Sequence, residues 1–133
     1  MPASEPRVFA YVSYRDVLGA IRWLETIGFE TVLRQEESGR VIHSELRSGD
    51  SVIMVASYDE ECQTPCLMGH STGRELYILT EHVDALFERA AAAGGHPVLP
   101  PESTDWGSRR ARVLDPEGNE WTFGSYEPGH ERV

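Results

Sequence analysis

The segment Asp16-Val-Leu-Gly-Ala-Ile-Arg-Trp-Leu-Glu-Thr-Ile-Gly28 decides the fold, because a second segment of the same design follows it as His82-Val-Asp-Ala-Leu-Phe-Glu-Arg-Ala-Ala-Ala-Ala-Gly94. In each, apolar residues recur at the i, i+3, i+4 and i+7 spacing of an amphipathic helix. They are Val17, Ala20, Ile21 and Leu24 in the first and Val83, Leu86, Phe87 and Ala90 in the second, each position being its counterpart plus 66. Asp16 is a suitable N-cap, and a glycine stands where each helix would end. Two matching helices predict two copies of one structural unit.

Stretches rich in β-branched and aromatic residues surround both helices and predict strands. Val8–Ser13 precedes the first helix, and Glu75–Leu79 precedes the second. Three more strands follow each helix: Glu30–Glu36, Val41–Arg47 and Ser51–Ser57, then His96–Leu99, Arg109–Leu114 and Asn119–Gly124. The sequence therefore predicts a single α+β domain, residues 1–133, in which two β-α-β-β-β modules form a cupped mixed sheet. The modules span about residues 7–57 and 74–126, and the polar segment 58–73 is either a linker or a mobile lid.

Turn residues set the register of the last hairpin in each module. Ser48-Gly-Asp50 and Asp115-Pro-Glu-Gly118 join the final two strands, and their glycines permit the positive φ that tight turns require. If Gly49-Asp50 forms a two-residue turn, Glu45 lies opposite Met54 and His43 lies opposite Ala56. We expect all four side chains on the open face of the sheet, away from the helix.

Alternation along the strands assigns the remaining side chains to two faces. The residues expected to pack under the helices are Val8, Ala10, Val12, Leu76, Ile78, Trp121 and Phe123. Those expected on the open face are Phe9, Tyr11, Ser13, Glu75, Tyr77 and Leu79. The open faces would then carry aromatic rings beside carboxylates, a combination suited to ligand binding.

The composition is that of a globular protein, with 40% apolar and 26% charged residues. Twelve basic against 22 acidic side chains leave a net charge of −10, which repels nucleic acid and anionic membranes. The charge provides either a well-solvated surface or an acidic cleft for a cationic ligand. No apolar run approaches the roughly 20 residues of a membrane span. Because residues 1–7 also lack the apolar stretch of a signal peptide, we expect a cytoplasmic protein.

Motifs for nucleophilic catalysis, phosphate binding and dinucleotide binding are absent from the sequence. The two cysteines, Cys62 and Cys66, lack the further ligands that a zinc site needs, and we expect free thiols. His70, His82, His96 and His130 occupy positions where surface or capping roles suffice. No established enzyme motif remains.

Two stretches resemble one known superfamily. They are His43-Ser-Glu-Leu-Arg-Ser-Gly-Asp-Ser-Val-Ile-Met54 and Trp106-Gly-Ser-Arg-Arg-Ala-Arg-Val-Leu-Asp-Pro-Glu-Gly-Asn-Glu-Trp121. Together with the paired modules, they are similar to the glyoxalase/bleomycin-resistance/dioxygenase (vicinal oxygen chelate) superfamily over roughly residues 7–126. The Trp-Gly-x-Arg and Asp-Pro-x-Gly-Asn-x-Trp strings are typical of the superfamily as a whole, and they do not identify one member.

The resemblance implies four metal-ligand positions, one from the first and one from the last strand of each module. Metal-using members place His, Gln or Glu there; in this chain the positions hold Phe9, Met54, Glu75 and Thr122. Only Glu75 is a strong ligand for a hard or borderline divalent ion, and a catalytic metal needs about three protein ligands. This departure predicts no metal cofactor and argues against glyoxalase, extradiol dioxygenase or epimerase chemistry.

Three functions remain open at this stage, and in the last of them the fold serves as an accessory or immunity subunit in a biosynthetic pathway, with a protein partner. In the first, His43, Glu45 and Glu75 share the open face as a substitute metal site, and the protein is a lyase, isomerase or dioxygenase. In the second, His43 and Glu45 are a hydrogen-bonded pair lining a polar cavity, and the protein binds a small molecule without metal or cofactor.

The second function is our leading prediction. The resemblance to bleomycin-resistance members implies a homodimer that sequesters an antibiotic or metabolite, with aromatic faces and acidic charge holding a flat, cationic ligand. Trp106 lies in the segment Pro100–Gly107, where its ring can stack on a ligand. Arg109 can pair with a carboxylate of the ligand or of the protein itself. The predicted ligand-binding residues are Phe9, Tyr11, His43, Glu45, Met54, Glu75, Tyr77, Trp106, Arg109 and Thr122.

Overall fold

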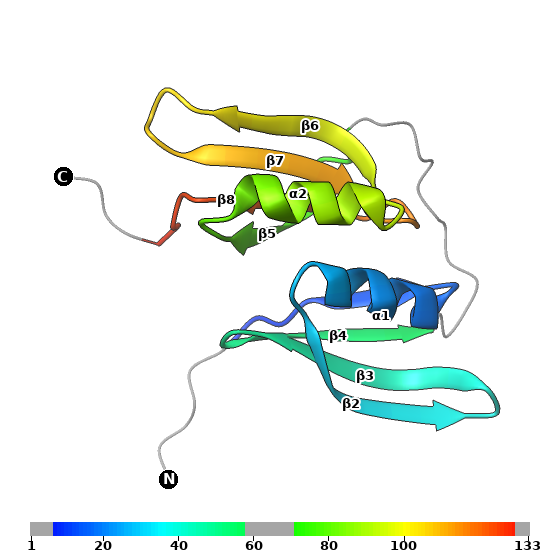
Figure 1. The fold of residues 1–133 in the computed structure, drawn as a ribbon. Helices are drawn as coiled ribbons and strands as arrows, with labels where there is room; N and C mark the ends of the chain where they lie inside the picture. The colour runs from blue at the N-terminus through cyan, green and yellow to red at the C-terminus, as the bar shows by residue number, and fades with distance from the viewer. Residues whose placement is uncertain (1–6, 58–70, 130–133) are drawn as a thin grey trace, which may run out of the picture. The chain divides into compact units, whose positions relative to one another are not determined.

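The computed structural model describes residues 7–57 and 71–129. The chain divides into two compact units, residues 1–61 and 62–133, each with one helix and a four-stranded sheet (Figure 1). We call the described parts module one (residues 7–57) and module two (residues 71–129). Most of the predicted connector, with Cys62, Cys66 and His70, and the C-terminal His130 lie outside the described residues. Neither helix of the described part has the length and apolar character that a membrane span requires.

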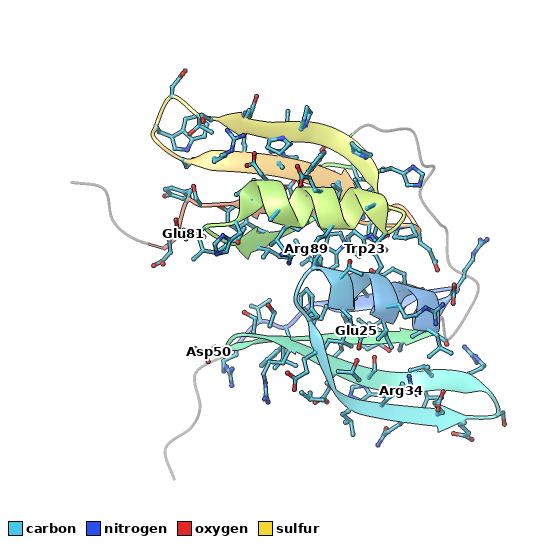
Figure 2. The ribbon with its side chains drawn as sticks, viewed as in Figure 1. Trp23, Glu25, Arg34, Asp50, Glu81 and Arg89 are labelled. Atoms are coloured by element: carbon cyan, nitrogen blue, oxygen red, sulfur yellow. The ribbon has the colours of Figure 1, made fainter. Side chains whose placement is uncertain are left out.

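Module one follows the predicted β-α-β-β-β order. Its elements are β1 (Tyr11–Tyr14), α1 (Val17–Thr26), β2 (Glu30–Glu37), β3 (Arg40–Ser48) and β4 (Ser51–Ser57). The strands lie in the order β1-β4-β3-β2, with β1 parallel to β4 and the other neighbours antiparallel. The hairpin that contains Asp50 (labelled in Figure 2) pairs Glu45 with Met54, which confirms the predicted register.

Module two repeats this topology. Its elements are β5 (Glu75–Leu79), α2 (Val83–Ala92), β6 (His96–Ser103), β7 (Arg109–Leu114) and β8 (Glu120–Gly124). The strand order β5-β8-β7-β6, with β5 parallel to β8, is that of module one element by element. The internal repeat predicted from the two helices is therefore confirmed, with one mixed sheet in each module.

The helices form where the apolar spacing predicts them. In α1 the Asp16 carboxylate accepts a hydrogen bond from the backbone N–H of Gly19 at 3.0 Å, which satisfies one of the unpaired donors of the first turn. The chain leaves the helix through Gly28 at φ 106°, a conformation in which a β-carbon would be strained. Val17, Ala20, Ile21 and Leu24 are buried in module one, as are Val83, Leu86 and Ala90 in module two.

The core of module two lies between α2 and one face of the sheet. Ala111 and Val113 of β7, and Trp121 and Phe123 of β8, are buried on this side, as predicted for the two aromatic residues. Burial of an apolar side chain such as Val113 or Phe123 contributes roughly 1.5–3 kcal/mol to the stability of the fold. The opposite face of each sheet, which we call the open face, carries the alternate side chains.

Two predicted strand boundaries are wrong by three residues or more, and the others agree to within one residue. β1 begins at Tyr11 instead of Val8, because its pairing with β4 starts at Tyr11 and Met54. Val8 is 98% exposed and does not pack under α1. In module two, β6 continues through Pro100 and Pro101 to Ser103, whereas the predicted strand ends at Leu99. An edge strand tolerates proline, since one side of its backbone needs no ladder partner.

Candidate functional site

A row of four side chains crosses the open face of module one. Strand pairing places Tyr11 beside Met54, Met54 beside Glu45, and Glu45 beside Leu33. His43 lies two residues from Glu45 on β3, and its Nε2 is 2.8 Å from Glu45 Oε2. The pair was predicted as one of two alternatives, and this contact occupies a nitrogen and an oxygen that a metal ion would otherwise use.

The corresponding row of module two is Tyr77, Thr122, Arg112 and Leu99, again in neighbouring register across the four strands. Both rows begin with tyrosine and end with leucine, and each of these pairs is separated by 66 residues. The third position differs in charge, because Glu45 of module one corresponds to Arg112 of module two. The two open faces thus have the same residues, tyrosine and leucine, at the ends of the row, but a side chain of opposite charge at the third position.

Glu75 is held by its neighbours in module two. The Thr122 hydroxyl donates a hydrogen bond to Glu75 Oε1 at 2.5 Å, and Arg112 Nε lies 3.8 Å from Glu75 Oε2. The family resemblance places Glu75 and Thr122 among the four metal-ligand positions, and the structure brings these two side chains into contact. In module one, Met54 pairs with Tyr11, while Phe9 precedes β1 and its ring lies under the Arg7 guanidinium.

Glu120, which pairs with Glu75 across β5 and β8, is buried. Its Oε1 accepts hydrogen bonds from the Thr72 backbone N–H at 2.5 Å and from the Thr72 and Ser71 hydroxyls at 3.0 Å each. Burial alone would raise the pKa of Glu120, but these hydrogen bonds outweigh it and hold the pKa below its ordinary value. Glu120 therefore ties residues 71–72, the last part of the predicted connector, to the sheet.

The Tyr77 ring lies against Gly124 of β8, which is two residues beyond Thr122, the residue that pairs with Tyr77. A β-carbon at Gly124 would overlap the Tyr77 hydroxyl and ring, so only glycine leaves room for the ring in this position. The Tyr77 hydroxyl donates to the backbone oxygen of Tyr126 at 2.7 Å, and its burial raises the pKa of the phenol. The ring is thereby fixed against the open face, yet 40% of the residue stays exposed to a ligand.

Trp106 stands in the short loop between β6 and β7 and is 54% exposed. The guanidinium carbon of Arg110 lies 5.5 Å from the centroid of its ring, which is cation–π geometry. Arg110 is oriented in turn by Glu102, since its Nε donates to Glu102 Oε1 at 2.8 Å. The indole is therefore positioned by charged partners, although it lies in a loop.

Arg109 has a different environment from the other predicted residues. Its Nε and Nη2 donate to the two carboxylate oxygens of Asp84 on α2, at 2.5 and 2.8 Å. These bonds hold the pKa of the Asp84 carboxyl below its usual value. Of the two partners predicted for Arg109, a protein carboxylate is the one observed. Strand alternation puts Arg109 on the α2 side, apart from the open face.

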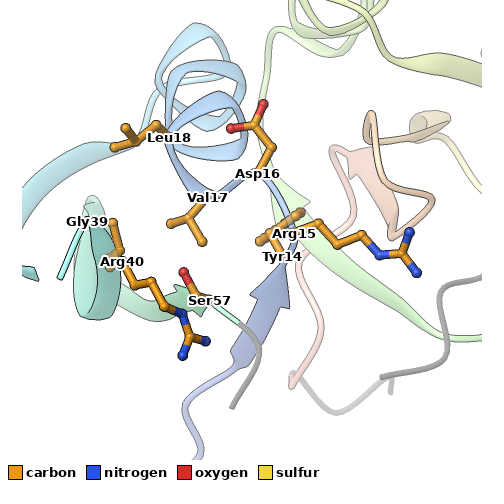
Figure 3. A pocket seen from close by; sticks show the side chains of 9 residues that line it. Tyr14, Arg15, Asp16, Val17, Leu18, Gly39, Arg40 and Ser57 are labelled. Atoms are coloured by element: carbon orange, nitrogen blue, oxygen red, sulfur yellow. The ribbon is translucent and has the colours of Figure 1, made fainter. Parts of the chain in front are cut away.

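One hollow lies at the beginning of each helix, outside the open faces. The first, of about 400 Å³, is lined by Asp16, Val17, Leu18, Arg40 and Ser57 among others (Figure 3). The second, of about 420 Å³, is lined by His82, Val83, Asp84, Arg109 and Ser125 among others. The helix positions correspond at +66 and the serines at +68, so the hollows are equivalent features of the repeat. In the second, the Arg109–Asp84 ion pair occupies part of the space.

Most of the predicted residues form two groups, one on each open face, whereas Phe9, which precedes β1, and Arg109, on the α2 side, belong to neither. Module one brings together Tyr11, His43, Glu45 and Met54, and module two brings together Glu75, Tyr77 and Thr122, with Trp106 stacked on Arg110 in the same module. The sequence analysis missed Arg110 and Arg112, although counting back from Thr122 through the Asp115–Gly118 turn would have placed both on the open face. Within residues 7–57 and 71–129, no three His, Cys, Asp or Glu side chains are arranged to hold a metal ion.

Two repeated β-α-β-β-β modules, each with a mixed four-stranded sheet under one helix, define a protein of the glyoxalase/bleomycin-resistance fold. The model of the Glyoxalase/Bleomycin resistance protein/Dioxygenase superfamily matches residues 12–123. The chain belongs to this superfamily, as the resemblance predicted.

The individual relatives do not identify a particular function within the superfamily. An uncharacterised protein of Mycobacterium bovis is 34% identical over 91 residues, which cover 65% of this chain and 59% of the relative, so the match spans little more than half of that protein. The structure of TioX from Micromonospora sp. ML1 is similar at 29% identity with a TM-score of 0.70, covering 95% of this chain and all of TioX. A bleomycin-binding protein in complex with bleomycin has the same fold at 17% identity and a TM-score of 0.60, covering 92% of this chain and all of that protein.

Proposed function

We propose that this chain is a metal-independent protein that binds a small aromatic molecule, an antibiotic or a metabolite, and sequesters it without transforming it. The observation that carries the proposal is the environment of Glu75. It is the only strong donor among the four family positions, and its carboxylate is engaged by the Thr122 hydroxyl with the Arg112 guanidinium 3.8 Å away.

The donor set does not fit a divalent ion. Arg112 places a positive charge beside the one carboxylate that would bind the metal, and two like charges at this range oppose each other. Met54 offers a soft thioether, Thr122 a neutral hydroxyl and Phe9 no lone pair. A catalytic zinc ion needs about three protein ligands and an open position, and these four side chains do not provide three suitable ligands.

The aromatic side chains of the open faces support a binding function. Tyr77 is fixed over Gly124, and Trp106 is fixed on Arg110, so both rings are oriented before a ligand arrives. A binding surface with ordered aromatic rings loses less conformational entropy when it associates. In module one, Tyr11 and Glu45 provide a ring and a carboxylate for a cationic group. The similarity to a bleomycin-binding protein adds a precedent for a drug as ligand in this fold.

Tryptophan fluorescence tests the proposal directly. Trp23 and Trp121 are buried and Trp106 is exposed, so ligand stacking should change mainly the Trp106 emission. We expect saturable quenching by members of a panel of aromatic compounds that includes bleomycin, and we expect Trp106→Phe to remove the signal. The absence of saturable binding across the panel, checked by calorimetry, would contradict the proposal. We further propose a homodimer, as in the bleomycin-resistance members of the superfamily, and light scattering that gives a mass near 14.9 kDa would contradict it.

A further inference from the structure

We propose that the open face of module two selects ligands that carry an acidic group beside an aromatic ring, with Arg112 binding the acid. This inference rests on the proposed binding function and names the chemistry of the ligand at one face. It differs from the expectation of a cationic ligand, which considered the carboxylates of the open faces and not the arginines of β7.

The two arginines of β7 share the open face. Ala111 and Val113 are fully buried on the α2 side, so the alternate residues Arg110 and Arg112 point to the opposite face. Residues two apart on a strand are separated by roughly 7 Å. Both arginines lie on an inner strand of the sheet, with β8 on one side and β6 on the other. A ligand lying on this face therefore meets guanidinium groups near the centre of the sheet.

Arg112 has hydrogen-bonding capacity that the protein does not use. Its Nε is buried and donates no hydrogen bond to any described residue, since Glu75 Oε2 at 3.8 Å is too distant. The Arg112 side chain as a whole is 31% exposed, so its terminal nitrogens are accessible. Because Nε itself is buried, a ligand carboxylate would bind the two terminal nitrogens, which are not among the buried unpaired atoms of the described residues, with charge-assisted hydrogen bonds.

Aromatic surface adjoins these arginines on the same face. Gly124, over which Tyr77 lies, pairs directly with Arg110, and Arg110 carries the Trp106 ring. Leu99 pairs with Arg112 on its other side. A planar ligand stacked on Trp106 or Tyr77 therefore extends over the strand that bears Arg112, and an acidic substituent on it can reach the guanidinium.

Nearby carboxylates limit the strength of this preference without reversing it. Glu102 is bound by Arg110, Glu75 by Thr122, and Glu120 by Ser71 and Thr72, so each already has hydrogen-bond donors. Their charges oppose an incoming anion, whereas the directed bonds from Arg112 favour it. We expect an acid to bind about tenfold more tightly than its uncharged analogue, a difference of about 1.4 kcal/mol.

Calorimetry with three matched probes tests the inference: 2-naphthoate, its uncharged analogue 2-naphthamide, and the cation 2-naphthylmethylamine. The full chain should bind the acid most tightly. Arg112→Met keeps an unbranched side chain but removes the charge, and it should bring the acid to the affinity of the amide while leaving the amide unchanged. Arg112→Lys keeps a positive charge without the planar fork and should retain part of the preference.

Arg89→Gln is the matched control, because Arg89 is exposed on α2 (Figure 2) and its loss changes the net charge by the same amount. It should leave the preference for the acid intact. Equal affinity of wild type for acid and amide, or equal effects of the Arg112→Met and Arg89→Gln changes, would overturn the inference while leaving the proposed binding function standing. If none of the naphthyl probes binds at millimolar concentration, the inference is contradicted, and the proposed binding function is contradicted as well if the panel of aromatic compounds also fails to bind. Circular dichroism confirms that each variant is folded.

Discussion

Single residues determine which chemical groups the open face of module two offers to a metal ion or to an organic ligand. Glu75 occupies a position that the family resemblance assigns to a metal ligand, and its neighbours are the Thr122 hydroxyl and the Arg112 guanidinium. Replacing a ligating side chain by threonine converts a metal donor into a hydrogen-bond donor, and an arginine beside it compensates the carboxylate charge that a metal would have balanced. Glu75, Thr122 and Arg112 therefore form a polar cluster on the open face.

Gly124 is predicted to be the residue on which the position of Tyr77 depends. Gly124→Ala should displace the Tyr77 ring and break its hydrogen bond to Tyr126, because the new β-carbon overlaps the ring. We expect a loss of unfolding free energy of about 1–3 kcal/mol, measured by urea denaturation. In a Tyr77→Ala background the same change should cost less than about 0.5 kcal/mol, since alanine is otherwise at least as suitable as glycine in a strand. Equal costs in the two backgrounds would show that the ring is not the cause.

The arginines of β7 show how far the sequence could predict the candidate site. The Trp106-Gly-Ser-Arg motif drew attention to Arg109, which the structure places against Asp84 on α2. Arg110 and Arg112 lie outside the part of the motif that was interpreted, and only the register of β7 against β8 puts them on the open face. Motifs identify residues that a family shares, whereas the face of a side chain depends on strand parity, which a short turn of uncertain length leaves open.

At the scale of elements, the Asp-Pro-Glu-Gly-Asn segment works as a structural turn. Asp115 is buried, and its Oδ1 accepts from the backbone N–H groups of Glu117 and Asn119 at 3.0 Å each. Its Oδ2 accepts from the Trp121 indole N–H at 3.1 Å. One carboxylate thus fixes the β7–β8 turn and orients the largest aromatic residue of the core. This arrangement gives the family motif a physical reason independent of any ligand.

Asp115→Ala should therefore destabilise the protein by about 2–4 kcal/mol, because it leaves the buried indole N–H of Trp121 and two part-buried backbone N–H groups without an acceptor. Urea denaturation measures the change. Asp50→Ala in the equivalent hairpin of module one is the control, since Asp50 is exposed and its side chain makes no hydrogen bond with the described residues, and it should cost less than about 0.5 kcal/mol. Similar costs for the two variants would refute the special role of Asp115.

The contact between Glu120 and residues 71–72 predicts a pH dependence. The pKa of Glu120 is lowered, so its ionised form stabilises the folded state above the ordinary pKa of 4.5, and this contribution is lost as the pH falls through the folded-state pKa. We expect the difference in unfolding free energy between wild type and Glu120→Gln to be constant from about pH 7 to pH 5 and to shrink below about pH 4.5. Glu25→Gln, at an exposed site on α1 (Figure 2), should give no such change. A difference that stays constant to pH 3 would contradict the prediction.

The elements themselves were largely predictable. Both helices and the β3–β4 hairpin follow from local signals, namely apolar spacing, an aspartate cap and glycine stops, and the structure confirms them. The errors fall where tertiary pairing decides. β1 starts at Tyr11 because β4 begins to pair with it there, and β6 continues through Pro100 because it is an edge strand. No local pattern reports where a partner strand starts or which strand lies at an edge.

At the scale of the whole molecule, the two modules keep the same residues at the ends of the open-face rows and differ in the charged residue within each row. Tyr11 and Tyr77 correspond, as do Leu33 and Leu99, while Glu45 corresponds to Arg112. Under the proposed function, we expect the apolar residues at the ends of each row to accept any flat ligand and the charged residue in the row to discriminate between ligands by their charge. The net charge of −10 acts on every charged ligand but is screened beyond about 8 Å at physiological salt. We therefore expect specificity to come from the central residues of each row.

The proposed function also predicts how the intact chain responds to ligand and to chelator. A ligand that binds only the folded state, present at about 100 times its Kd, should raise the unfolding free energy by about 2.7 kcal/mol. Phe9 has no donor atom, the Met54 and Thr122 side chains do not suit a divalent ion, and the charge of Glu75 is compensated by Arg112. This stabilisation should therefore be the same after exhaustive treatment with EDTA. Thermal unfolding with and without EDTA, together with elemental analysis of the purified protein, makes the comparison. Stabilisation that EDTA abolishes and added zinc or manganese restores would instead establish metal-dependent binding, and the His43, Glu45 and Glu75 alternative would then be favoured.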